Sequence, residues 1–200
     1  MILLLILSTF AFQTTGGRPV DGYLEMPSSP PRAVLLYFHR YTEKGDAVET
    51  WESITKRGYA VAGYTNFPAT DVIQKANDAV IALHKNPDLQ DKPVIAVGAS
   101  MGALYASQWF AANSQARALV LIVPGSADIC DYLERSGGRP VFLIQAENDD
   151  TSYGSGAKIR QCMPNGKQYM LKGVGHNFLS DAIIGDIANW LDSLTLSQNQ

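Results

Sequence analysis

The sequence predicts a doubly wound α/β fold, in which helices cover both faces of a mostly parallel β-sheet. Several candidate strands are continuous apolar runs, of which residues 33–38 and 118–123 are the clearest. Strands of this kind have both faces buried, as in a parallel sheet between helices. Helical patterns alternate with these runs, which is typical of the same architecture. The length of 200 residues fits one domain with one sizeable core.

The individual elements follow from local patterns of apolar residues. The candidate strands are residues 19–24, 33–38, 59–64, 94–97, 118–123, 141–145 and 168–171. A helix-favouring stretch covers residues 103–112. Three further helical faces are expected, the second of them after an N-cap at Thr70. These faces comprise Ala47, Val48, Trp51 and Ile54; Ile73, Ala76, Val80 and Leu83; and Leu179, Ile183, Ile187, Trp190 and Leu194.

The N-terminal segment differs in composition from the rest of the chain. Residues 1–12 are apolar apart from two hydroxyl side chains, and the first charged residue is Arg18. This resembles the apolar part of a secretory signal peptide, with cleavage expected after Ala11, and it is too short for a stable membrane anchor. We therefore expect a signal peptide and leader at residues 1–17, a single folded domain at 18–200, and export to the periplasm or medium. A buried first strand is the alternative.

Charge and cysteine content narrow the choice of partners. The formal net charge is −3 and no basic cluster is present, so a nucleic-acid partner is not expected. The two cysteines, Cys130 and Cys162, match no zinc-binding spacing. Each falls in a helix after one of two neighbouring strands, so we expect a disulfide in an exported chain. In a cytosolic chain they would be ordinary buried thiols.

The motif with the clearest chemical meaning is Gly98-Ala99-Ser100-Met101-Gly102. It lies between the apolar run at residues 94–97 and the helix-favouring stretch at 103–112. A serine at such a strand-to-helix turn is held in strained geometry with its oxygen pointing out over the sheet, and is typical of a nucleophile. The alternative is that Ser100 caps the following helix.

Two further chemical groups follow later strands. Catalytic groups of doubly wound sheets lie beyond the carboxyl ends of the strands. Asp149 follows the strand at 141–145, with Asp150 or Glu147 as alternative acids, and His176 follows the strand at 168–171. A serine hydroxyl needs a base to accept its proton, and a carboxylate can orient a histidine for that role. His176 could instead be a surface residue at the start of a helix.

These residues, with the turn Gly173-Val174-Gly175-His176, resemble the α/β-hydrolase superfamily, in particular its small lidless members of the dienelactone-hydrolase type. The resemblance covers residues 20–194. It implies that Ser100 is the nucleophile, Asp149 the acid and His176 the base, with Ala146 where the family usually has glycine. Only residues 124–128 separate a strand from a helix where larger relatives insert a cap, so we expect no cap domain and an open site.

The oxyanion of the reaction needs hydrogen-bond donors. The backbone N–H of Met101, at the start of a helix, is one. The second is expected from Tyr41, with Arg40 as the alternative, although related enzymes have His-Gly where this chain has His39-Arg40.

The expected function is a monomeric serine hydrolase that cleaves a small-molecule ester or thioester through an acyl-enzyme. No metal or organic cofactor is implied. An inactive binding protein and an acyltransferase on the same fold are the alternatives.

Overall fold

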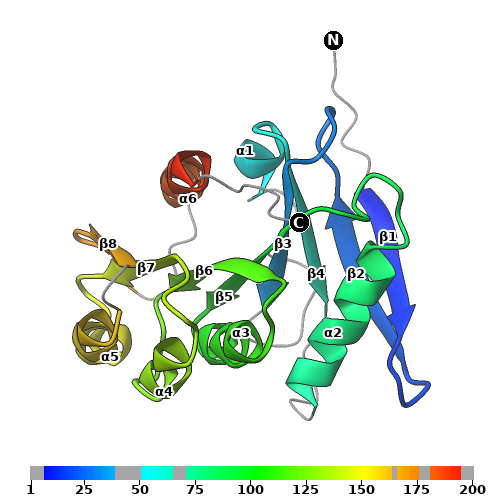
Figure 1. Ribbon diagram of the computed structural model, residues 1–200. Coiled ribbons are helices and arrows are strands. Elements are labelled where there is room, and N and C mark those ends of the chain that lie inside the picture. Colours follow the sequence, from blue (N-terminus) through cyan, green and yellow to red (C-terminus); the bar gives the residue numbers. More distant parts are fainter. Residues whose placement is uncertain (1–6, 39–50, 65–70, 164–165, 176–180, 195–200) are drawn as a thin grey trace.

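The computed structural model describes residues 7–38, 51–64, 71–163, 166–175 and 181–194. Its centre is an eight-stranded sheet in the order β1-β2-β4-β3-β5-β6-β7-β8 (Figure 1). The strands are β1 (Leu7–Gln13), β2 (Pro19–Glu25), β3 (Ala33–Phe38), β4 (Tyr59–Tyr64), β5 (Val94–Ala99), β6 (Ala116–Ile122), β7 (Val141–Ala146) and β8 (Gly166–Leu171). Strands β3 to β8 run parallel to one another, whereas β2 pairs antiparallel with β4 and β1 pairs antiparallel with β2.

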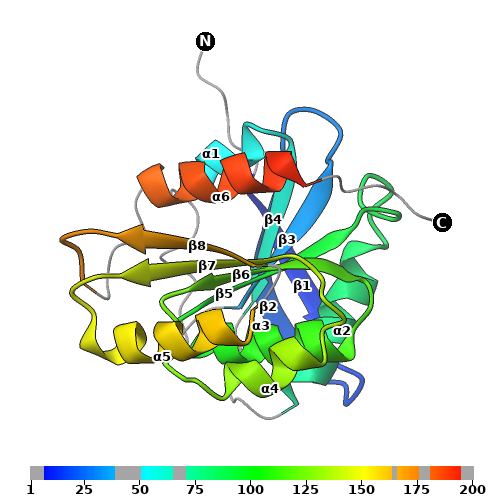
Figure 2. The ribbon, with the colours of Figure 1, turned by 60° about the vertical axis from the view of Figure 1, so that its left-hand side comes forward.

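Helices cover both faces of this sheet, which confirms the predicted fold class. Helices α1 and α6 lie on one face, and α2, α3, α4 and α5 lie on the other (Figures 1 and 2). Their bounds are α1 (Glu52–Thr55), α2 (Val72–Leu83), α3 (Met101–Ala112), α4 (Ile129–Glu134), α5 (Asp150–Gln161) and α6 (Asp181–Ser193). Of the helices described, none combines the length and the apolar composition that a bilayer crossing needs.

The core consists of two layers, one on each side of the sheet. Strand β3 shows why a continuous apolar run is needed. Its even-numbered residues, such as Leu36, pack with α2 and α3, and Leu35 packs with α1 and α6. All six residues of β3 are buried. Side chains of a strand alternate between the two faces, so a strand inside such a sandwich requires an apolar residue at every position.

Helix α2 differs from its predicted face. Ile73 is 40% exposed, and the helix instead buries the neighbouring Val72 together with Ala76 and Leu83. The helix follows Asp71, whose φ of 62° is left-handed, rather than the predicted cap Thr70, which lies outside the described residues. Val72 and Ile73 are both apolar, so the sequence does not determine which of them faces the sheet. In the structure, Val72 packs against the sheet and Ile73 does not.

The other predicted helical faces agree with the structure where it describes them. Ile54 of α1 is buried, as is Trp51, which directly precedes this helix. Ile183, Ile187 and Trp190 of α6 are buried against the sheet. The predicted face residues Ala47, Val48 and Leu179 lie outside the described residues.

The expected leader contains a strand of the sheet. β1 pairs with β2 along its whole length, from Leu7 opposite Glu25 to Gln13 opposite Pro19. Phe10 and Phe12 are buried. Residues 7–13 of the expected leader are thus paired with the sheet in this structure, and cleavage after Ala11 would remove residues 7–11 from β1. The alternative interpretation of this segment, a first strand, agrees with the structure at residues 7–13.

Cys130 and Cys162 form a disulfide, as predicted. Their Cα atoms are 5.5 Å apart, inside the range that a disulfide spans. Cys130 lies in α4 and Cys162 directly follows α5, so the bond joins the helices that come after β6 and β7. The bond thereby restrains two consecutive β-α units relative to each other.

We predict that Phe12→Ala lowers the free energy of unfolding by about 3 kcal/mol, the lower end of the range for such changes in a core. The Phe12 ring packs edge-on against Tyr64 with ring centroids 5.5 Å apart. Gln13→Ala changes an exposed residue of the same strand and should have an effect below about 0.5 kcal/mol. Urea unfolding compares the two variants. Equal midpoints would show that β1 contributes nothing to the core.

We also predict that unfolded, unreduced protein has no titratable thiol and that reduction releases both. Because the bond closes a loop with a sequence separation of 32 residues, Cys130→Ser should lower the free energy of unfolding by roughly 3–4 kcal/mol in the chain-entropy model. A thiol count of two without reductant would contradict the bond.

Candidate active site

Ser100 occupies a strained turn between β5 and α3. Its φ of 53° and ψ of −118° lie outside the regions that a residue with a side chain ordinarily adopts. Gly98 makes this turn possible, because a Cβ at that position would lie 2.3 Å from the Gly102 carbonyl oxygen and 2.6 Å from the Ala103 Cα. The sequence motif therefore folds into the strained strand-to-helix turn that the sequence predicts.

Ser100 does not cap α3 with its side chain. Its hydroxyl makes no hydrogen bond to the first turn of that helix, so the capping alternative is wrong. The backbone anchors the residue instead: the Ser100 N–H donates to the Ile122 carbonyl at 2.9 Å, and the Ala103 N–H donates to the Ser100 carbonyl at 3.1 Å. The turn is thus tied to both β6 and α3.

The start of α3 offers a donor for negative charge. Met101 is the first residue of this 12-residue helix, and its side chain is exposed. First-turn N–H groups have no partner inside a helix, and the helix dipole favours an anion there. Tyr41 and Arg40, the candidates for the second donor, lie outside the described residues.

The next strand end is strained as well. Val123 directly follows β6, with a φ of 41° that is unusual for a β-branched residue. Its N–H donates to the Ile144 carbonyl at 2.8 Å, which ties the turn to β7. Only residues 123–128 lie between β6 and α4, so the predicted absence of a cap at this point is confirmed.

Burial separates the three candidate acids. Asp149 is 4% exposed, whereas Asp150 and Glu147 are exposed. The Ser152 N–H donates to Asp149 Oδ1 at 3.2 Å, so this carboxylate also stabilises the first turn of α5. The Gly173 N–H donates to the Glu147 carboxylate at 3.0 Å, which holds Glu147 toward the segment after β8.

The segment after β8 runs beside the acid loop. The Glu147 N–H donates to the Leu171 carbonyl at 2.9 Å, and the Asn148 N–H donates to the Val174 carbonyl at 3.0 Å. Figure 2 shows the arrowheads of β7 and β8 at the same edge of the sheet. Ser100 and Asp149 follow parallel strands that end at this edge, with β6 between them. His176 itself lies outside the described residues.

Sequence reasoning missed two contributors to this edge. Ser152 supplies the backbone donor to Asp149, and Gln145 places a buried amide beneath α5. Gln145 had a readable signal, because it is a polar residue in the otherwise apolar strand β7. Ser152 had no such signal in the sequence, because it acts through its backbone N–H.

Among the described residues, no group of three or more His, Cys, Asp or Glu side chains is arranged to hold a metal ion.

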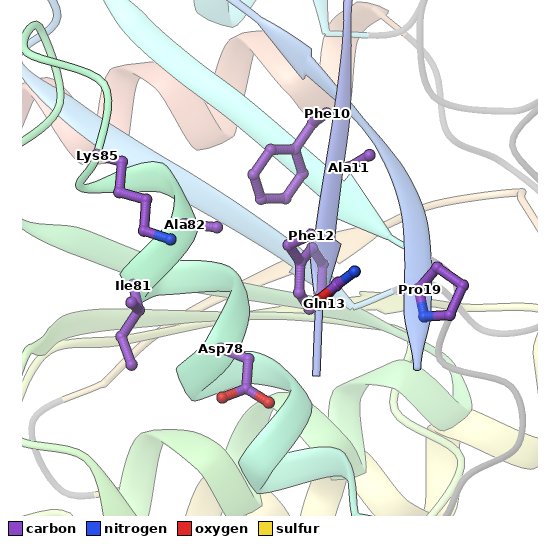
Figure 3. Close-up of a pocket in the computed structure, with 9 residues that line it drawn as sticks. All are labelled: Phe10, Ala11, Phe12, Gln13, Pro19, Asp78, Ile81, Ala82 and Lys85. Atoms are coloured by element: carbon purple, nitrogen blue, oxygen red, sulfur yellow. The ribbon is translucent and has the colours of Figure 1, made fainter. Parts of the chain in front are cut away.

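A cavity of about 640 Å³ lies elsewhere, between β1 and α2. Phe10 and Phe12 project from β1 toward Ala82 and Asp78 of α2 (Figure 3). Asp78 is already bonded, because the Thr15 N–H donates to its carboxylate at 2.8 Å. Strands β2, β4 and β3 separate β1 from β5, so this cavity is distinct from the elbow.

Comparison with known proteins finds similar solved structures but no similar sequence family. No protein-family model and no curated protein matches the chain. Solved structures do match over nearly the whole chain. The esterase domain of a Rhodothermus marinus protein is 15% identical with a TM-score of 0.77, over 92% of this chain and 95% of that one. The esterase PF2001 of Pyrococcus furiosus is 14% identical with a TM-score of 0.77, over 94% and 91%.

A third structure, DcsB in complex with its substrate analogue, has a TM-score of 0.80 at 12% identity, over 93% of this chain and 98% of that one. The strained turn after β5, the mostly parallel eight-stranded sheet and these similarities agree with one another. The chain therefore has the α/β-hydrolase fold.

Proposed function

We propose that this protein is a serine hydrolase that cleaves a carboxylic ester or thioester through an acyl-enzyme. The strained turn at Ser100 is the observation that carries this proposal. Strain in a non-glycine residue persists only where the surroundings impose it, and it concentrates at functional sites. The similarity to solved esterases supports hydrolysis as the reaction class.

The proposed mechanism assigns one step to each group. Ser100 Oγ attacks the substrate carbonyl while His176 takes its proton, and His176 then donates that proton to the leaving group. Asp149 fixes the tautomer of the imidazole and stabilises its protonated form. The Met101 N–H, together with the N–H of Tyr41, stabilises the oxyanion. Water then repeats the sequence on the acyl-enzyme and releases the acid.

The choice of acid rests on burial and on the course of the chain. Asp149 is the buried one of the three candidate carboxylates. The Asn148 N–H is bonded to Val174, which comes two residues before His176 in the sequence. The segment that leads to the base therefore runs along the acid loop, and this supports pairing of Asp149 with His176.

No cap is inserted in the short connection between β6 and α4, so the proposed site is open. An open site supports a small or surface-bound acyl group as the substrate.

Export to an oxidising compartment is also part of the proposal. The disulfide supports it, because such bonds persist in oxidising compartments. N-terminal sequencing of protein from the native host locates the mature start, and β1 makes a start after Ala11 costly to the sheet.

We predict that a fluorophosphonate probe labels Ser100 covalently, because the proposed mechanism makes its hydroxyl the nucleophile. Intact-mass analysis should show one added probe on the wild type and none on Ser100→Ala. Ser107→Ala is the matched control, since Ser107 lies on α3 with its hydroxyl bonded to the Ala103 carbonyl. Labelling that survives in Ser100→Ala, or none in folded wild type, would contradict the assignment.

We predict that Asp149→Asn lowers kcat by about 10⁴-fold, because the imidazole loses its tautomer lock. Asp150→Asn changes an exposed neighbour and should retain most of the activity. Hydrolysis of p-nitrophenyl acetate measures both variants, compared at matched thermal stability. A larger loss in Asp150→Asn would assign the acid role to Asp150.

A further inference from the structure

Gln145 is the polar exception in strand β7, whose other residues are apolar. Its side chain is 1% exposed and lies on the same face of the sheet as Leu143, beneath α5. Burial removes an amide from water, and that is unfavourable unless its hydrogen bonds are replaced. The buried Gln145 amide therefore needs hydrogen-bond partners within the protein.

The Gln145 amide bonds to the strand and the helix beside it. Its Nε2 donates to the Ser152 carbonyl in the first turn of α5 at 3.4 Å, and its Oε1 accepts from Gln168 Nε2 of β8. The helix makes room for the amide at Gly156, where a Cβ would lie 1.4 Å from Gln145 Nε2. Residues of β7, β8 and α5 are thus matched around one buried side chain.

This contact reaches the candidate acid through a single residue. Ser152 accepts the bond from Gln145 at its carbonyl and donates its own N–H to Asp149 Oδ1 at 3.2 Å. Asp149 is buried as well, and its N–H donates to the Ala146 carbonyl, which ends β7. The first turn of α5 is therefore held both by Asp149 and, from below, by Gln145.

We infer that Gln145 is a positioning residue, which fixes the first turn of α5 so that the Asp149 carboxylate faces the base. The inference rests on the proposed function. Asp149 lies on the turn from β7 into α5, so a shift of that turn changes the direction of the carboxylate. Orientation matters because displacements of about 1 Å in a catalytic constellation cost up to 100-fold in rate.

Gln145→Met tests this role, since methionine keeps the length of the side chain and removes both hydrogen bonds. We expect kcat to fall about tenfold or more with KM within about twofold. The acidic limb of the kcat/KM profile should also move to lower pH. A displaced carboxylate stabilises the imidazolium less, so the pKa of the base falls.

Leu143→Val is the matched control, because it disturbs packing two residues earlier on the same face of β7 without touching the network. It should lower the melting temperature while leaving kcat and the pH profile unchanged. If Gln145→Met behaves in the same way, Gln145 is only a core residue and the inference is overturned.

The same assay includes wild type, Ser100→Ala and Asp149→Asn, so that the two claims fail differently. If Ser100→Ala retains wild-type activity, the proposed function fails and the role of Gln145 with it. If only Asp149→Asn retains it, the assignment of the acid fails, and the role of Gln145 fails with that assignment. If both lose activity as expected and Gln145→Met matches Leu143→Val, the proposed function stands and only the positioning role is lost.

Discussion

Backbone hydrogen bonds between the carboxyl ends of neighbouring strands fix the layout of the candidate site. The residue just past each of β5, β6 and β7 donates its N–H to the strand beside it. Ser100 bonds to Ile122, Val123 bonds to Ile144, and Glu147 bonds to Leu171. These bonds extend the parallel ladder by one step beyond β5, β6 and β7. The sheet, and not the loops alone, therefore fixes the positions of Ser100 and of the turn that leads to Asp149.

This arrangement tolerates strain because the sheet beneath it is well packed. Backbone conformations such as those of Ser100 and Val123 cost of order 1–3 kcal/mol each. The strands that lead into both turns are almost entirely buried, with apolar residues against helices on the two faces. Gly98 is also needed for the turn at Ser100, because a side chain there would collide with the start of α3. A rigid sandwich thus holds an unfavourable turn in place.

Much of the fold could be predicted from sequence, because doubly buried strands leave an unambiguous pattern. The structure reproduces the predicted strands at residues 33–38 and 59–64 residue for residue. The elbow was also predictable, since strand, pentapeptide and helix each have a local signature. The phase of α2 was not, because Val72 and Ile73 are both apolar and only packing on the sheet distinguishes them.

The N-terminal strand and the candidate acid show a second limit of prediction from sequence. An apolar N-terminal segment fits a signal peptide as well as a strand, and pairing with β2 is a long-range contact that composition does not encode. Asp149 and Asp150 are adjacent and chemically identical, and only the start of α5 buries one and exposes the other. Gln145 carried a signal, but its partners come from β8 and α5 and appear only in three dimensions.

A crystal structure of the phosphonylated protein would test the central claim most directly, because the adduct marks the nucleophile and mimics the oxyanion. The account predicts phosphorus on Ser100 Oγ, with the phosphonyl oxygen about 2.7–3.1 Å from the Met101 backbone nitrogen. It also predicts a hydrogen bond from His176 to the Asp149 carboxylate. Phosphorus on another residue, an oxygen directed away from α3, or His176 bonded to Asp150 or Glu147 would contradict it.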